Sequence, residues 1–255
     1  MEDSFKKILN TMVEEIAQHE KPFYRELWRG ERDFLQLPLA RRNYFAQSPL
    51  TDRSYKPGGF VKIAGDGESN FLVEWNPKDI GGESFGVKSQ RPGVCFVNSH
   101  EALEKALWCY EQDSVPLLAE SAPLVLFRSI EKYAADSLIA DEQSLKVLTP
   151  YIYSRPKSYL KAISVVGSSF ATQEFESYAP FAKEVRLVLA LPEVGSFAVA
   201  QLSPVAKFVP LLGCYIEDIE GTIVLTKLHG PVTPIIRYNT GIQLGERYPD
   251  GFSLR

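Results

Sequence analysis

The sequence predicts an α/β fold: a mostly parallel sheet covered by helices, followed by a small antiparallel β lobe. Apolar runs over 124–128, 160–166 and 184–190 predict buried strands, and segments of helical periodicity lie between them. Strands that alternate with helices in this way are typical of βαβ units and of a parallel sheet. After Pro192 the helical segments stop, and short strands separated by turn residues follow.

The N-terminal part of the chain predicts one helix and then several strands. Apolar residues recur at helical spacing from Ser4 to about Glu20, with Ser4 as a suitable N-cap. Strands are expected within 54–70, which is rich in glycine, and over 71–75 and 93–97. A further helix is expected from Asn98.

The rest of the chain completes the two predicted lobes. The spacing of Ile130, Tyr133, Ala134 and Leu138 predicts a helix after the first buried strand, and a short helix is expected from Thr172 to Phe181. After Pro192 the segments SFAVAQ, CYIED, GTIVLTKL and PIIRY predict the strands of the closing sheet. We therefore expect an α/β lobe over 1–200 and a β lobe over 201–255.

Composition and charge narrow the class of protein. The 255 residues are 45% hydrophobic and 24% charged, as in ordinary globular proteins. A formal charge of -4 gives no electrostatic reason to expect nucleic acid as a partner. No apolar run has membrane-spanning length, and the N-terminus lacks the features of a signal peptide. The three cysteines and three histidines are widely spaced, so we expect a cytoplasmic protein with reduced thiols and no metal site.

Four segments, in order, resemble the phenylacetate–CoA ligase branch of the adenylate-forming enzymes. They are YRELW with LQLPLARRNYFAQSPLTD, then VKIAGDGESNFLVEWNPKDI, then LKAISVVGSSF through EVRLVLALPEVGSFAVA, and finally GTIVLTKLHGPVTPIIRYNTG. The last segment is the best match, since the family has a glycine, a strand and an RY-x-TGD motif there. The resemblance implies an adenylate-forming fold and a site for an acyl or aryl group.

Departures from the family pattern imply a shortened, degenerate member that does not use ATP. Asp66 and Glu68 lie where the family has its phosphate loop, and two carboxylates repel a polyphosphate. Ile242 replaces the aspartate that binds the ribose, and Ala190-Leu191 replaces the pair that packs on adenine. We also expect no separate C-terminal catalytic domain, because the chain ends at Arg255. No cofactor is expected.

Two residues are candidates for catalysis. Glu193 occupies the position of the family's catalytic glutamate, at the end of a predicted sheet strand, where α/β proteins place ligands. It is either a general base or a salt-bridged turn residue. His229 lies in a turn close in sequence to the RY motif, and is either a proton carrier or a solvated loop residue.

Six further residues are candidates for substrate binding. Val166 and Leu191 would contribute apolar surface, and the turn at Gly167 and Ser168 would supply backbone amides for an oxyanion. A plain strand-to-helix turn explains Gly167 and Ser168 equally well. Arg237 and Tyr238 lie in the RY motif, either at the substrate or in structural roles.

Two classes of function follow from these residues. The first is an ATP-independent protein, in a biosynthetic pathway, that binds or hydrolyses an acyl or aryl thioester of CoA or a carrier protein. The second is a non-catalytic pseudo-enzyme that binds an acyl carrier or a ligase. The sequence leaves open whether the protein is an enzyme, which acyl group it binds, and its oligomeric state.

Overall fold

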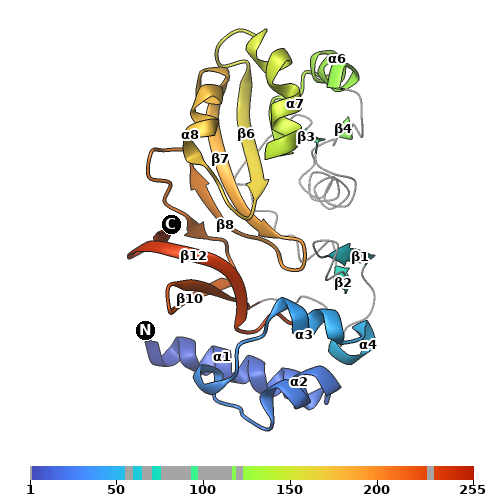
Figure 1. The fold of residues 1–255 in the computed structure, drawn as a ribbon, viewed down its shortest axis with the longest axis vertical. Helices are drawn as coiled ribbons and strands as arrows, with labels where there is room; N and C mark the ends of the chain where they lie inside the picture. The colour runs from blue at the N-terminus through green and yellow to red at the C-terminus, as the bar shows by residue number, and fades with distance from the viewer. Residues whose placement is uncertain are drawn as a thin grey trace. The chain divides into compact units, whose positions relative to one another are not determined.

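The computed structural model describes residues 2–54, 60–64, 71–75, 93–96, 117–118, 123–228 and 233–255. They divide into two compact units, each made from two segments of the chain. The first unit comprises Met1–Asp79 and Gly213–Leu244, and the second comprises Ile80–Leu212 and Gly245–Arg255. Figure 1 traces the chain through both units.

The second unit is built on a mixed sheet with parallel strands at its centre. In the described residues this sheet has the order β4-β3-β5-β6-β7-β8-β9, parallel from β4 to β7 and antiparallel from β7 to β9. Its strands are β3 (Gly93–Phe96), β4 (Leu117–Leu118), β5 (Ser137–Asp141), β6 (Leu160–Gly167), β7 (Ala182–Leu191), β8 (Gly195–Gln201) and β9 (Val209–Pro210). The predicted α/β class, and the strands predicted over 160–166 and 184–190, are thereby confirmed.

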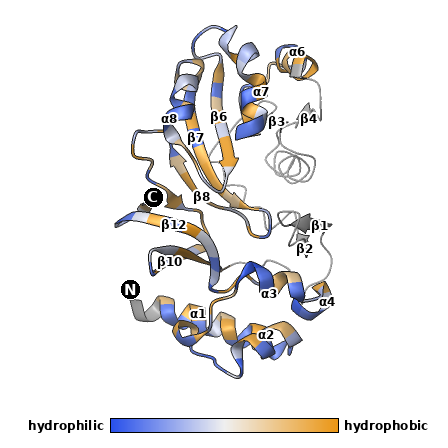
Figure 2. Cartoon of the chain, in the orientation of Figure 1, coloured by the Kyte–Doolittle hydropathy of each residue, from blue (hydrophilic) through white to orange (hydrophobic). Residues whose placement is uncertain are grey.

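The core of the second unit lies around β6 and β7. Both strands are predominantly hydrophobic in Figure 2, and burial along them is nearly continuous rather than alternating. This pattern is typical of parallel strands covered on both faces. Ile163, Val165, Leu187, Val188 and Leu189 are fully buried.

The described helices of this unit are α6 (Pro123–Tyr133), α7 (Glu142–Tyr153), α8 (Thr172–Phe175) and the 3-10 helix η3 (Glu176–Phe181). Helix α7 packs against β5 and β6, and η3 packs against β7. The predicted helix from Thr172 to Phe181 is confirmed as α8 followed by η3.

The prediction of a strand over 124–128 is wrong, because α6 covers these residues. Leu126, Phe127 and Ile130 are buried at helical spacing, whereas Leu124 and Val125 are 47% and 59% exposed. A five-residue apolar run does not distinguish a strand from one face of a helix. The helix ends before Ala134, whose φ of 51° is left-handed, and the strand that pairs with β6 is β5.

Asp141 joins β5 to α7 and caps that helix. Its side chain accepts a hydrogen bond from the backbone N–H of Ser144 at 2.6 Å. We expect Asp141→Ala to lower the free energy of unfolding by about 1 kcal/mol, because the helix loses its N-cap. Asp141→Asn keeps an acceptor and serves as the control. Urea denaturation of the two variants checks this, and equal stability of both would contradict the capping role.

The first unit combines N-terminal helices with antiparallel strands. Its helices are α1 (Glu2–Gln18), α2 (Pro22–Trp28), the 3-10 helix η1 (Phe34–Gln36), α3 (Arg42–Gln47) and α4 (Leu50–Arg53). Strands β1 (Phe60–Ala64) and β2 (Phe71–Trp75) form an antiparallel pair. Phe45 links the helices to the strands, with ring centroids 4.9 Å from Phe23 and 5.5 Å from Tyr238. The predicted N-terminal helix and first two strands are confirmed.

The predicted antiparallel lobe is a sheet of four strands within the described chain, in the order β10-β11-β12-β13. Its strands are β10 (Cys214–Ile219), β11 (Thr222–Lys227), β12 (Tyr238–Tyr248) and β13 (Gly251–Leu254). Strand β12 begins in the first unit and continues into the second.

Two strands were assigned wrongly within this C-terminal region. SFAVAQ belongs to β8 of the main sheet and pairs with β7, not with the closing strands. PIIRY is not a strand, and β12 begins only at its last residue, Tyr238. Arg237 has a left-handed φ of 44°, which interrupts extended backbone. The helix predicted from Asn98 lies outside the described residues.

Candidate functional site

The parallel strands of the second unit end at one edge of the sheet. Asp141 at the end of β5 is in register with Val166 of β6, and Gly167 at the end of β6 is in register with Leu189 of β7. The carboxyl ends of parallel strands are where open α/β sheets bind their ligands. We call this the carboxyl edge.

Glu193 lies in the turn that joins β7 to β8 at the carboxyl edge. Leu191 and Gly195 pair across the turn, and the backbone N–H of Val194 donates to the carbonyl of Leu191 at 3.1 Å. Gly195 has a φ of 76°, so a residue without a side chain suits the turn. Glu193 is only 6% exposed, and its neighbours in sequence are largely apolar.

The turn after β6 folds back tightly on itself. A Cβ atom at Gly167 would lie 3.3 Å from the Phe170 ring and 3.4 Å from the carbonyl oxygen of Ser169. Ser168 and Ser169 are both exposed. The turn therefore places two exposed serines at the carboxyl edge, at the end of the strand next to β7.

The predicted apolar residues lie inside the second unit. Val166 and Leu191 are 3% and 6% exposed. Leu189 and Phe197 are completely buried on β7 and β8. These side chains form the apolar interior directly below the carboxyl edge.

Arg237 and Tyr238 lie in the interior of the first unit. The Arg237 side chain forms an ion pair with Glu217. Its Nε lies 3.2 Å from Oε2 of Glu217, and its Nη2 lies 3.2 Å from Oε1. Its Nη1 donates to the carbonyls of Leu35 and Leu37 at 2.8 and 2.6 Å. Tyr238 is 1% exposed. Arg237 thus uses most of its donors to tie the η1 segment to the strands of this unit.

The structure groups some of the candidates and separates others. Val166, Gly167, Ser168, Leu191 and Glu193 share the carboxyl edge of the second unit. Arg237 and Tyr238 belong to the first unit. His229 lies outside the described residues, as do Asp66 and Glu68.

Sequence reasoning missed Asp141 and Glu217. Asp141 lies at the carboxyl edge, at the end of β5. The sequence pattern predicts a helix through Leu138 instead of this strand, so it does not mark Asp141 as the end of a strand. An aspartate followed by the helical pattern EQSLKVLTPYIY is the signal that identifies it as an N-cap. Glu217, in the strand CYIED, gives no local signal that it pairs with Arg237, twenty residues away.

The residues that the sequence resemblance assigns to nucleotide positions, Ile242 and Ala190–Leu191, lie within strands of the structure. Ile242 on β12 offers an aliphatic side chain, and its backbone N–H is bonded to the Thr240 hydroxyl at 3.1 Å. Ala190 and Leu191 are buried within β7.

Other features of the described residues bear on chemistry. Among them, no group of three or more His, Cys, Asp or Glu side chains could hold a metal ion. In the same part of the chain, no helix has the length and apolar character needed to cross a membrane. Burial raises the pKa of the Cys214 thiol, which disfavours the reactive thiolate.

Comparison with known proteins finds similarity in structure but not in sequence. No protein-family model matches the chain, and no curated protein matches it either. Solved structures do match. MenE from E. coli with bound OSB-AMS has a TM-score of 0.55 and 11% identity, over 76% of this chain and 46% of that chain.

Two other solved structures give the same picture. The o-succinylbenzoate CoA synthetase (MenE) of Bacillus subtilis, bound to the product analogue OSB-NCoA, has a TM-score of 0.60 and 13% identity, over 76% of this chain and 48% of that chain. An AMP-forming acyl-CoA synthetase-like protein from Dyadobacter fermentans has a TM-score of 0.57 and 17% identity, over 77% of this chain and 59% of that chain. The chain thus spans about half the length of these structures. Over three quarters of its own length it has the fold of the adenylate-forming enzymes.

Proposed function

We propose that this protein binds an acyl or aryl thioester, of CoA or of a carrier protein, at the carboxyl edge without using ATP. The observation that carries the proposal is the position of the Glu193 carboxylate, in the β7–β8 turn at the carboxyl edge. The neighbouring strand ends at the half-buried Gly167, and the exposed Ser168 follows it. A carboxylate and backbone amides at the end of a parallel sheet are suited to a polarised carbonyl group.

Hydrolysis is the reaction that these groups suit best. Glu193 would take a proton from water, whose oxygen then attacks the thioester carbonyl carbon. The turn amides at Gly167 and Ser168 would stabilise the negative charge on the carbonyl oxygen. The carbon–sulfur bond then breaks, giving the free acid and a thiol that receives the proton. His229 remains a candidate second proton carrier.

The acyl group is proposed to be aryl, as in the phenylacetate–CoA ligase branch. The support is the fourth segment, GTIVLTKLHGPVTPIIRYNTG, which resembles that branch best. Val166 and Leu191 are buried beneath the carboxyl edge, so in this proposal they form the apolar floor under the aryl ring. In this proposal the protein serves a cytoplasmic biosynthetic pathway.

We expect no ATP binding at millimolar ATP with magnesium, and no carboxylate-dependent pyrophosphate exchange. The reason is the lack of a ribose acceptor at Ile242, together with Asp66 and Glu68 in the region that resembles the phosphate loop. Calorimetric titration with ATP and an exchange assay with aromatic acids test this. Robust exchange by this chain alone would refute the proposal.

A thermal-shift screen tests the ligand class. Binding stabilises a protein by RT ln(1 + [L]/Kd), so a ligand reveals itself without knowledge of the reaction. We expect aryl-CoA thioesters to raise the melting temperature, and ATP and AMP to leave it unchanged. A rise in melting temperature with ATP but not with thioesters would contradict the proposed thioester ligand.

A non-catalytic role is the second candidate, and the burial of Glu193 favours it. A carboxylate that is 6% exposed would reach a substrate only if the turn left an opening above it. In this alternative the protein binds an acyl carrier or a ligase and modulates it. Thioester binding without turnover would favour this second candidate over hydrolysis.

A further inference from the structure

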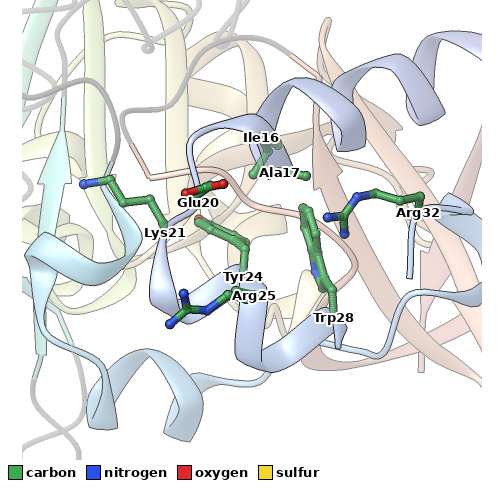
Figure 3. Close-up of a pocket in the computed structure, with 8 residues that line it drawn as sticks. All are labelled: Ile16, Ala17, Glu20, Lys21, Tyr24, Arg25, Trp28 and Arg32. Atoms are coloured by element: carbon green, nitrogen blue, oxygen red, sulfur yellow. The ribbon is translucent and has the colours of Figure 1, made fainter. Parts of the chain in front are cut away.

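A small basic cavity lies in the first unit, between the end of α1 and helix α2. Its volume is about 190 Å³, below the roughly 300–1,000 Å³ of pockets that hold drug-sized ligands. The buried rings of Tyr24 and Trp28, 5.2 Å apart between centroids, form part of its wall. Figure 3 shows these rings with the charged side chains around them. The cavity is large enough for one small chemical group.

The charges around this cavity are unbalanced. Lys21, Arg25 and Arg32 contribute three positive charges, and Glu20 contributes one negative charge. The surplus is therefore two positive charges on a cavity wall that is otherwise aromatic and aliphatic. A surplus of positive charge attracts an anion.

Several side chains that line the cavity are hydrogen-bond donors. Lys21 donates to the Thr51 carbonyl at 3.0 Å, and Arg32 uses Nη1 for the Glu31 carbonyl at 2.9 Å. The exposed Arg25 side chain and the buried Trp28 side chain, which carries an indole N–H, also line the cavity. A wall that carries cationic donors in surplus fits a ligand that carries acceptors only.

We infer that this cavity binds a phosphate group. A phosphate dianion matches the surplus of two charges, whereas a carboxylate would leave one of them unbalanced. Its oxygens accept from planar guanidinium groups in charge-assisted hydrogen bonds. The group is either inorganic phosphate or the phosphate end of a larger ligand. The inference does not depend on the thioester proposal, which concerns the second unit.

Calorimetric titration with three probes tests this inference: inorganic phosphate, 4′-phosphopantetheine and pantetheine. We expect saturable binding of the first two that weakens as sodium chloride is added. Pantetheine, which lacks the phosphate, is expected not to bind at this site. Equal affinity for both phosphates identifies a free-anion site, whereas tighter binding of phosphopantetheine identifies the phosphate subsite of a larger ligand.

Variants show whether binding occurs in this cavity. Arg25→Gln and Arg32→Gln are each expected to weaken phosphate binding tenfold or more, since each removes a charged donor. Trp28→Phe removes only the N–H and should weaken it less. Arg41→Gln, an exposed arginine at the N-cap of α3 in the same unit, is the matched control and should bind as the parent does.

Three results would overturn the inference. They are the absence of saturable phosphate binding, equal weakening by Arg41→Gln, and unchanged affinity in both Arg25→Gln and Arg32→Gln. The melting temperature of each variant without ligand is measured alongside. A variant that melts well below the parent is replaced by the lysine substitution at the same position, which retains the charge but not the guanidinium geometry and should bind at intermediate affinity.

Discussion

Glu193→Gln is expected to reduce thioester hydrolysis by two or more powers of ten while leaving the melting temperature close to that of the parent. A positioned general base contributes typically 10²–10⁴-fold to a rate, and glutamine has the same shape but accepts no proton. Steady-state hydrolysis of an aryl-CoA thioester, followed through release of the free thiol, measures the effect.

The matched control is Glu184→Gln, on the same strand but far from the carboxyl edge. Glu184 lies near the start of β7 and forms an ion pair with Arg186. We expect it to hydrolyse thioesters at the parental rate. If Glu193→Gln is as active as the parent, Glu193 is not the base, and the non-catalytic candidate takes the place of the hydrolase.

Arg237→Met is expected to lower the free energy of unfolding of the first unit by about 3–5 kcal/mol. The substitution removes the guanidinium that pairs with Glu217, a carboxylate that is 9% exposed. It also removes the donor that the carbonyls of Leu35 and Leu37 share. Urea denaturation followed by tryptophan fluorescence, which includes Trp28 of this unit, measures the loss.

A double variant separates the ion pair from the carbonyl contacts. Arg237→Met with Glu217→Met removes both charges, so it should be less destabilised than the sum of the single variants. Arg41→Met, at an exposed position, should change stability by less than about 0.5 kcal/mol. A loss below about 1 kcal/mol in Arg237→Met would contradict the structural role of this residue.

The fold class followed from features that are local in the sequence. Long apolar runs such as LKAISVV and EVRLVLA have few alternatives to a buried strand, and both became strands of the parallel sheet. The shorter run LVLFR did not decide between strand and helix. Its helical conformation depends on which of its side chains the rest of the second unit buries, and a short sequence window does not contain that information.

The candidate site was also predictable only where its residues are set by local sequence. The carboxyl edge was predictable, because strand ends and the residues after them are read directly from the sequence, as with Gly167 and Glu193. The surroundings of Arg237 were not, because its partners Leu35 and Leu37 lie about two hundred residues away in the chain. A pairing of this kind arises only when the chain folds.

The most direct test of the central claim is calorimetric titration with an aryl thioester of N-acetylcysteamine in the absence of ATP and magnesium. This compound has a thioester but no phosphate, so its binding is independent of the basic cavity beside α2. The account predicts saturable binding that added ATP does not change. Absence of binding until ATP and magnesium are added would contradict it.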